Sequence, residues 1–311
     1  MDPQEELSTT VFIPTWRRAA WLDKCIRSVL EQNPLPSEIV VAVREEDEEA
    51  GTLVREWISR SPIPLRLVDP GGPGQAQAVA AGLAATTSEI FVEIDDDVEV
   101  VDGWMAGLIA PFADPAVACV GGRMLVEVPA RRVPRDAGCL RWYGKVVSNV
   151  SQLPADSPKA VDGVQECNWA WRTQVLRTIE FDPVLQFDAQ AMWGLDLTLQ
   201  VKESGWRVIY QPAAKVRDRE APRDPSFTRA DRPARIYAHS RNYTYIMLKH
   251  LHGLRRLPFF VWWWGMGEPG SYGVIKAVVD LFRRGKVVRI ETASAFKGRA
   301  EGVKLWRKGK R

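Results

Sequence analysis

The chain has 311 residues, 46% of them hydrophobic and 26% charged, which is the composition of a folded globular protein with room for one large domain and an extension, or for two small domains. The net charge of +3 is too small to indicate a nucleic-acid-binding protein. The four cysteines stand far apart, with no CxxC spacing and no histidine near them. This pattern excludes the common zinc-site motifs and predicts reduced, buried thiols in a cytosolic protein; the residues are Cys25, Cys119, Cys139 and Cys167.

The sequence predicts no membrane-spanning segment. Residues 1–7 are acidic and contain no apolar core, so we expect no secretory signal. The longest apolar stretch, around Leu257 to Met266, is shorter than the ~20 residues that a spanning helix needs. We therefore expect a cytoplasmic protein.

The first part of the chain alternates short apolar runs with helical patterns. Because strands that alternate with helices of this length form βαβ units, the pattern predicts a parallel sheet. Strands are expected over residues 9–14, 38–43, 65–68, 90–94 and 117–121, and helices over 19–32, around 53–58, over 75–85 and near 103–112.

Polar and glycine-rich segments follow four of these strands. In a parallel sheet ligands bind outside the carboxyl ends of the strands, so the four segments are expected to face one ligand. A glycine loop alone is weak evidence, since it is more often a tight turn, and the coincidence of the four is what favours a binding site. They are Pro14-Thr15, the loop after Val43, the turn 71–74 and Asp95 to Asp97.

The acids Asp95, Asp96 and Asp97 end the apolar run 90–94. Adjacent carboxylates at the end of a buried strand repel one another, and hard oxygen ligands suit Mg²⁺ or Mn²⁺ carrying a phosphate. Taken alone, such a triplet is more often a solvated acidic turn. The strand before it and the neighbouring loops favour the metal site.

The second part of the chain is less regular. Residues 125–162 contain scattered Pro, Arg and Gly and are expected to be irregular or to add antiparallel strands. Asp196 lies near the start of the helical pattern 193–201, where the helix dipole favours a carboxylate. Asp196 is therefore either a helix-terminal charge or a functional acid. A further strand is expected over 206–210, and residues 214–219 are expected to leave the sheet as a mixed-charge cluster.

Together these residues resemble the family 2 glycosyltransferases, which have the GT-A fold. Order and spacing agree from about Thr9 to Asp218. The matching pieces are Val11 to Arg17, Ser28 to Gln32, Gly74 to Gly82, the acids Asp95 to Asp97 at the DxD position, Phe181-Asp182, and Gly194-Leu195-Asp196 in place of the family's Gly-Glu-Asp.

The resemblance implies an α/β fold of the GT-A type, with a mostly parallel central sheet and flanking helices. It also implies an inverting hexosyltransferase that uses a nucleotide-diphosphate sugar, with Asp196 as the base that deprotonates the acceptor hydroxyl. Mn²⁺ or Mg²⁺ would be held by Asp97, Asp95 and Asp218. The donor would be contacted by Pro14, Thr15, Arg17, Asp47, Gly74, Gln75, Asp95, Asp96 and Arg219.

The chain departs from the family pattern in three places. Arg44 and the acids up to Asp47 stand where the family commonly has an aspartate that contacts the nucleobase. Leu195 replaces the glutamate before the catalytic aspartate. Asp218 stands where the family often has a histidine metal ligand, and a carboxylate is also a suitable hard ligand.

The last third of the chain predicts an amphipathic helix over 233–251, in which His250 is expected to have no special role. Three consecutive indoles follow at Trp262 to Trp264, and Trp is enriched where proteins meet lipid headgroups. Many Lys and Arg residues come after them between 283 and 311. The combination favours peripheral contact with an anionic membrane, and the alternative is a packed helical appendage with a solvated basic tail.

We therefore expect a nucleotide-sugar-binding half over residues 8–125, an acceptor-side half over 126–220 and a helical, aromatic and basic extension over 221–311. The expected reaction transfers a sugar to a hydroxyl of a lipid-linked or polysaccharide acceptor, with no nucleic-acid partner. One alternative is a nucleotidyltransferase. This sequence lacks the Arg/Lys-rich glycine signature that such an enzyme is expected to have near its first strand, and that function would give Asp196 no role. The other is a non-catalytic nucleotide-sugar-binding scaffold, supported only by Leu195 and Arg44.

Overall fold

The computed structural model describes residues 7–127, 132–185, 192–219, 221–222, 231–268, 271–284 and 286–309, with backbone alone at 280–284 and 286–288. The chain forms two compact units. Unit 1 comprises Met1–Cys139, Val147–Phe181 and Leu197–Ser226, and unit 2 comprises Leu140–Val146, Asp182–Asp196 and Phe227–Arg311. The three-part division expected from the sequence stays a prediction.

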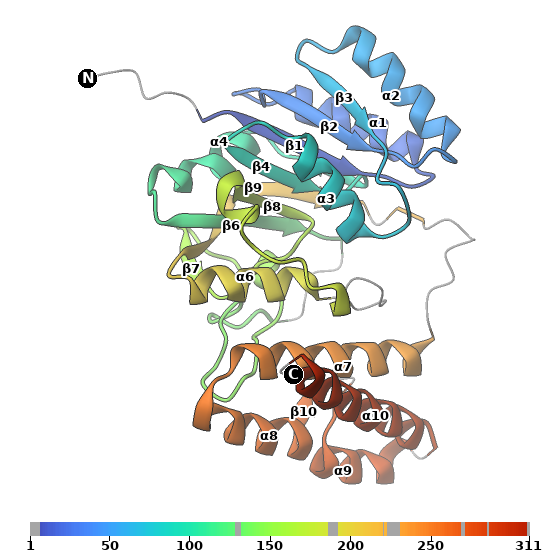
Figure 1. Ribbon diagram of the computed structural model, residues 1–311, viewed down its shortest axis with the longest axis vertical. Helices are drawn as coiled ribbons and strands as arrows, with labels where there is room; N and C mark the ends of the chain where they lie inside the picture. Colours follow the sequence, from blue (N-terminus) through green and yellow to red (C-terminus); the bar gives the residue numbers. More distant parts are fainter. Residues whose placement is uncertain are drawn as a thin grey trace. The chain divides into compact units, whose positions relative to one another are not determined.

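Unit 1 is built on a sheet to which the described residues contribute nine strands, in the order β3-β2-β1-β4-β8-β6-β9-β5, with β7 also paired to β9 (Figure 1). Strands β8, β5 and β7 run opposite to the other six, so the sheet is mostly parallel, as predicted. The strands are β1 (Thr9–Pro14), β2 (Glu38–Ala42), β3 (Leu65–Val68), β4 (Ile90–Ile94), β5 (Val98–Val100), β6 (Val117–Leu125), β7 (Lys159–Val161), β8 (Asn168–Arg172) and β9 (Arg207–Asp218).

Helices cover both faces of this sheet. The apolar sides of α1 (Ala19–Leu30), α2 (Glu48–Arg60) and α4 (Trp104–Ile109) share one hydrophobic core with the strands. On the other face α3 (Gln75–Ala85) approaches β1 closely, since a Cβ added at Gly82 would lie 2.3 Å from the Phe12 ring. Two further helices, α5 (Thr173–Leu176) and α6 (Trp193–Glu203), follow β8. Asp196 is in the first turn of α6, as expected.

The structure differs from the prediction at β9. The sequence indicated a strand ending near Tyr210, but β9 continues to Asp218, so the mixed-charge segment lies inside the sheet. The reason is an irregularity: β6 advances one residue, from Gly122 to Arg123, while β9 advances four, from Gln211 to Lys215.

A single buried amide fills this irregularity. The side chain of Asn168 donates to the carbonyl oxygens of Ala214 at 3.1 Å and Arg123 at 3.3 Å, and it accepts from the Trp104 indole N–H at 2.8 Å. The backbone groups that lose their strand partners are thus partly satisfied by Asn168. The second half of β9 then pairs with β5, placing Asp218 opposite Val98.

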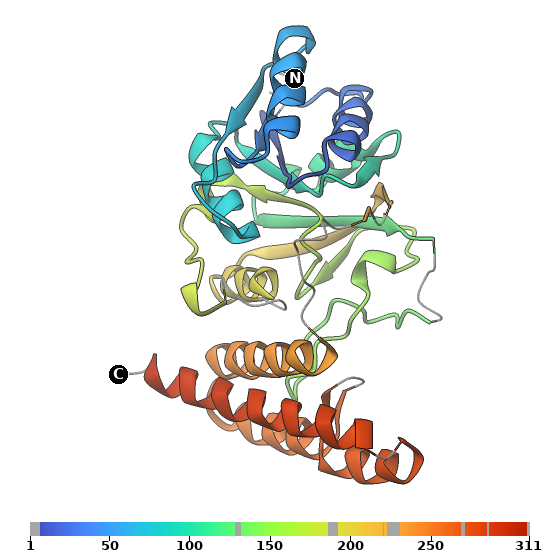
Figure 2. The same cartoon turned by 90° about the vertical axis from the view of Figure 1, so that its right-hand side faces the viewer.

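Unit 2 is mainly helical, with α7 (Arg232–His250), α8 (Arg256–Gly265), α9 (Val274–Arg284), α10 (Lys286–Lys308) and a short ribbon of β10 (Gly267–Glu268) and β11 (Ser271–Tyr272). Figure 2 shows α10 running alongside α7. Gly298 and Gly302 permit this close approach, because a Cβ at either position would lie within 2.4 Å of an α7 carbonyl oxygen. The basic C-terminal region is therefore a packed helix up to Lys308, and its Arg299 is fully buried.

Among the helices of the described residues, we find none with the length and apolar character needed to span a membrane.

Candidate active site

The three consecutive acids Asp95, Asp96 and Asp97 form the turn between β4 and β5, and they differ in their surroundings. Asp96 is buried and accepts a hydrogen bond from the Thr15 hydroxyl at 2.6 Å. The Arg18 guanidinium donates to Asp96 and to Asp97, both at 3.0 Å. The ends of β1 and β4 are therefore joined through these side chains, as the predicted strand-end edge requires.

Asp97 also ties the acids to the end of β9. Its side chain accepts from the backbone N–H of Ala221 at 3.2 Å, and its carbonyl oxygen accepts from the backbone N–H of Arg219 at 3.0 Å. Since Asp218 pairs in register with Val98, the structure brings Asp218 beside Asp97, as expected. The Arg219 side chain itself points to Glu99, with which it forms an ion pair at 2.7 Å.

Asp95 reports the electrostatics of this cluster. Burial, together with the nearby charges of Asp97, Asp96, Glu166 and Asp218, raises the pKa of Asp95 to about 7. Carboxylates held this close repel one another in the absence of a counter-charge. The donor set is thus all oxygen and negatively charged, which fits a hard divalent cation.

No three His, Cys, Asp or Glu side chains of the described residues are gathered as a ready-made set of metal ligands. The acidic cluster can still bind a divalent cation, because Mg²⁺ is usually held by one or two carboxylates together with water and substrate phosphates. Arg18 meanwhile partly offsets the charge of Asp96 and Asp97.

The loops after β1 and β2 are linked through Asp47. This residue caps α2 by accepting from the backbone N–H of Ala50 at 3.3 Å, and it also accepts from the backbone N–H of Arg17. Between the two loops, the guanidinium of Arg44 lies 3.1 Å from the Trp16 ring centroid, and that of Arg17 lies 4.8 Å from it. Pro14, Thr15, Arg17 and Asp47 are therefore brought together at one strand-end edge.

The glycine turn leads into α3 and places Gln75 against a buried acid. Gly74 has φ +120°, a conformation that favours glycine. The Gln75 amide donates to Glu93 at 3.1 Å, and the Trp169 indole donates to the same carboxyl at 2.7 Å. Burial raises the pKa of Glu93 well above its ordinary value, which the two hydrogen bonds only partly oppose. In this structure the Gln75 side chain therefore contacts a buried residue of β4.

Asp196 belongs to unit 2, where it lies in a buried network with the end of α7. One carboxylate oxygen is 2.8 Å from Nε2 of His250 and the other is 2.9 Å from Nζ of Lys249. Lys249 also contacts Asp182 at 3.0 Å, and the Tyr245 hydroxyl donates to Asp182 at 2.7 Å. Two acids and two basic side chains are thus interlocked.

The network keeps Asp196 ionised. Burial alone would raise its pKa, but the hydrogen bond with His250 and the charge of Lys249 outweigh it, so the pKa of Asp196 lies below its ordinary value. For Lys249 burial acts to lower the pKa, and the two aspartates more than offset this and raise it. Asp196 is therefore ionised at neutral pH.

Sequence reasoning missed Lys249 and His250, which had been assigned no role. Both lie more than fifty residues after Asp196, so no local spacing connects them to it. The available signal was weak: two basic side chains stand in the last turn of the helix predicted over 233–251.

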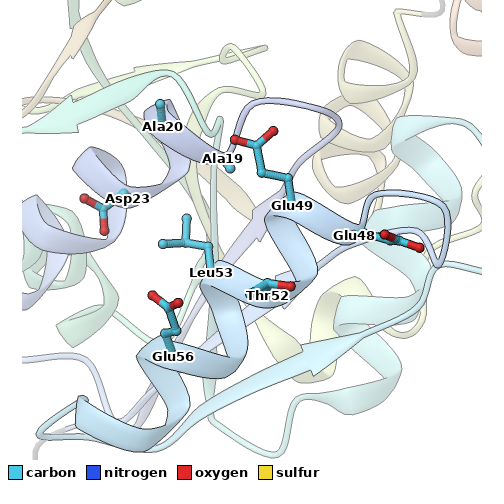
Figure 3. A pocket seen from close by; sticks show the side chains of 8 residues that line it. All are labelled: Ala19, Ala20, Asp23, Glu48, Glu49, Thr52, Leu53 and Glu56. Carbon is cyan, nitrogen blue, oxygen red and sulfur yellow. The ribbon is translucent and has the colours of Figure 1, made fainter.

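A cavity of about 720 Å³ opens between α1 and α2, and Figure 3 shows carboxylates on both of its helical walls. Its lining contains none of the residues expected to bind donor or metal. The lining residues are Ala19, Ala20, Asp23, Glu48, Glu49, Thr52, Leu53 and Glu56.

Comparison with known proteins decides the family. The sequence model of Glycosyl transferase family 2 matches residues 10–169, just over half of the chain. The chain belongs to this family. Membership of this family favours glycosyl transfer over the nucleotidyltransferase and scaffold alternatives.

Curated relatives agree over part of the chain. Two pre-mycofactocin glycosyltransferases, from Mycobacterium tuberculosis strains CDC 1551 and H37Rv, are each 27% identical over 148 residues. That match covers 47% of this chain and 30% of theirs, so the chain spans less than a third of these relatives' length.

Solved structures confirm the GT-A fold. GalNAc-T7 with UDP, GalNAc and Mn²⁺ has a TM-score of 0.61 at 16% identity, covering 97% of this chain and 57% of that one. The mannosyltransferase PcManGT of Pyrobaculum calidifontis, with GDP-Man and Mn²⁺, has a TM-score of 0.59 at 19% identity, covering 99% and 89%. TarS of S. aureus, with UDP-GlcNAc, has a TM-score of 0.53 at 14% identity, covering 97% and 92%.

Proposed function

We propose that this glycosyltransferase is metal-dependent and inverting, and that it moves a sugar from a nucleotide-diphosphate donor to a hydroxyl of a lipid-linked or polysaccharide acceptor. The observation that carries the proposal is the buried carboxylate cluster at the end of β4, where burial and the neighbouring acids together raise the pKa of Asp95 to about 7. Similar folds solved with Mn²⁺ and a nucleotide or nucleotide sugar support it.

In this proposal the donor lies along the strand-end edge of unit 1. Asp95, Asp97 and Asp218 would hold Mn²⁺ or Mg²⁺, and the bound cation would supply positive charge to neutralise the departing diphosphate. Thr15 and Arg18 fix Asp96 and so orient the acidic turn. The remaining donor contacts are assigned to Pro14, Arg17, Asp47, Gly74, Gln75, Asp96 and Arg219.

Asp196 acts as the base in this proposal. It accepts the proton of the acceptor hydroxyl while that oxygen attacks the anomeric carbon from the face opposite the nucleotide. A carboxylate has about four lone-pair sites, so Asp196 can accept this hydrogen bond in addition to those of Lys249 and His250. One displacement inverts the anomeric configuration.

The acceptor and the cellular location complete the proposal. A cytoplasmic enzyme takes its nucleotide sugar from solution, and peripheral contact with an anionic membrane gives it access to a lipid-linked acceptor. The aromatic and basic residues of unit 2 support this contact.

The test is hydrolysis of UDP-, GDP- and dTDP-sugars by the full chain with Mn²⁺, with Mg²⁺ and with chelator. We expect one nucleotide class to be hydrolysed, only with metal, and the released or transferred sugar to have the inverted anomeric configuration by NMR. Undiminished turnover in chelator would refute metal dependence, and a retained configuration would refute the single displacement. Binding of the donors without hydrolysis of any of them would contradict this proposal.

A further inference from the structure

Exposed apolar side chains are concentrated in one part of unit 2. Twelve large hydrophobic residues of the described chain are exposed, and nine of them lie between residues 254 and 290. Leu254 is 82% exposed and Val261 is 75% exposed, values that leave almost the whole side chain in water. Isolated exposed apolar residues are ordinary, but a gathered set marks an interaction surface.

The helical spacing of these residues puts them on defined stripes. Leu257 and Val261 are four residues apart along the outer side of α8, and Leu254 stands three residues before Leu257 in the short 3-10 turn Gly253–Arg255 that leads into α8. On α9 the exposed residues are Val274, Ile275, Val278 and Val279. We call these seven residues the α8/α9 face.

Packing within unit 2 explains why this face points outward. The opposite side of α8 is buried, with the Trp263 indole donating to the Thr244 hydroxyl of α7 at 2.8 Å. The stripes of α8 and α9 adjoin, since a Cβ at Gly265 would lie 3.8 Å from Cδ1 of Ile275. The inner side of α8 is therefore covered by α7, while α9 packs against α8 and α10.

An exposed indole stands beside α8. Residues 140–146 form a small hairpin, closed by the pairing of Leu140 with Val146, and Trp142 at its tip is 68% exposed. The rings of Trp142 and Tyr143 are 5.6 Å apart, and those of Tyr143 and Trp262 on α8 are 5.4 Å apart. Tryptophan is enriched at the headgroup level of bilayers, where one part of the ring is in apolar and one in polar surroundings.

The charge of unit 2 indicates which kind of partner binds the α8/α9 face. Residues 227–311 contain nineteen Lys and Arg but only five Asp and Glu. Two copies of so basic a unit repel one another, whereas an anionic lipid surface attracts it. An apolar face with an aromatic neighbour and excess positive charge is the combination found in helices that lie in the membrane interface.

We infer that the α8/α9 face, together with Trp142, is the surface by which unit 2 docks in the headgroup region of an anionic bilayer. The inference deepens the proposed function and rests on it in one respect, the lipid-linked acceptor. Because α10 is packed against α7, the basic C-terminal residues up to Lys308 are not a loose tail that could bind a membrane by charge alone. The docking surface is instead assigned to the exposed apolar residues of the α8/α9 face.

The experiment is sedimentation of the full chain with vesicles of phosphatidylcholine alone or of an equal mixture with phosphatidylglycerol. We expect binding to the anionic vesicles, weakened by salt, and little binding to the neutral ones. The double variant Leu257→Glu/Val261→Glu should lose about tenfold or more in partitioning, because it replaces two inserted apolar side chains with anions. Trp142→Ala should lose less.

The matched control is Leu35→Glu/Ile58→Glu, which changes two side chains of unit 1 that are 41% and 46% exposed. It adds the same charge and should bind vesicles as wild type does. Equal losses in both double variants would show that net charge alone matters and would overturn the inference.

Light scattering and donor hydrolysis separate the remaining outcomes. A concentration-dependent dimer that Leu257→Glu/Val261→Glu abolishes, with no vesicle binding by wild type, would assign the face to a second copy instead. Donor hydrolysis without vesicles tests the proposed function by itself. Hydrolysis without vesicle binding refutes only the docking surface, and vesicle binding without hydrolysis refutes only the proposed function.

Discussion

Three adjacent carboxylates have three different surroundings in this protein. Asp96 is tied to Thr15 and Arg18, Asp97 to Arg18 and the backbone after β9, and Asp95 has a pKa raised by burial and by its acidic neighbours. The sequence indicated the cluster but not this division. It follows that the three positions differ in their response to substitution.

Asp97→Ala should reduce nucleotide binding in Mn²⁺ to the metal-free level while leaving the fold intact. Removal of one acid from a repelling cluster relieves charge, and Arg18 keeps its hydrogen bond to Asp96. Calorimetry with UDP and GDP, with and without Mn²⁺, measures the effect. Asp102→Ala, which removes an exposed acid five residues further on, is the control and should bind as wild type. Equal affinity with and without Mn²⁺ in the wild type would contradict the prediction.

Asp196→Asn should lower sugar transfer by roughly 10²–10⁴-fold, the usual size of a general-base contribution, and leave donor affinity near wild type. Asp182→Asn is the matched control, because Asp182 shares Lys249 with Asp196 but is not the proposed base. Single-turnover transfer and donor titration separate the two effects. Comparable losses in both variants would mean that the interlocked network, and not proton transfer, sets the rate.

The same network makes stability depend on pH. The folded-state pKa of Asp196 is below the ordinary value of 3.8, so its contribution is complete above pH 3.8 and is lost as pH falls through the lower value. Lys249 behaves oppositely, with a contribution complete below its ordinary 10.5 and lost as pH rises beyond it. The difference in unfolding free energy between wild type and Asp196→Asn should therefore shrink in acid, as denaturant unfolding at several pH values would show. A difference that stays constant would rule out the lowered pKa.

At the scale of elements, the sequence predicted those whose signal is local. The apolar runs of β1 to β4 and the Ala-rich α3 were found within about a residue. Burial on both faces of β1, β2 and β4 leaves a continuous apolar pattern. The antiparallel position of β8 between β4 and β6 and the length of β9 were missed. Both depend on partners distant in sequence, which local patterns do not contain.

The close approach of α7 and α10 depends on two glycines. Gly298→Ala or Gly302→Ala should destabilise unit 2 by roughly 1–3 kcal/mol, the usual cost of overpacking, although alanine favours helix. The added methyl would lie 2.3 Å from the Tyr237 carbonyl oxygen or 2.4 Å from that of Arg241. Gly309→Ala is the control, with its nearest contact at 3.8 Å, and should be neutral. Thermal unfolding measures all three, and a stabilised Gly302→Ala would show that the helices separate easily.

At the scale of the whole molecule, charge is divided between the two parts of the chain. The net charge of +3 conceals a strongly basic stretch over residues 227–311 and an acidic remainder. The sequence analysis indicated the basic end of this stretch, the Lys and Arg residues between 283 and 311. It did not predict that α10 is packed or that the apolar surface lies on α8 and α9, because both follow from tertiary contacts.

The thiols provide a check on the whole fold. Burial raises the pKa of Cys25, Cys119 and Cys167 well above the ordinary value, while Cys139 is only half-buried and shifted less. In native protein one thiol should react with a thiol reagent, faster as pH rises and thiolate forms, and three more should react only after unfolding. Mass spectrometry of the labelled protein identifies them. Rapid labelling of Cys25 would contradict the buried position of α1.

The amide of Asn168 affects which charge stands at the strand-end edge of unit 1. The Asn168 side chain fills the irregularity of β9 and so fixes the register of β9 against β5, in which Asp218 lies opposite Val98. A slip of one residue turns every side chain of a strand to the other face. Both neighbours of Asp218, Arg217 and Arg219, are arginines. Deletion of a single residue from 212–214 would therefore put an arginine side chain at the position of the Asp218 carboxylate. A position that attracts cations would then repel them.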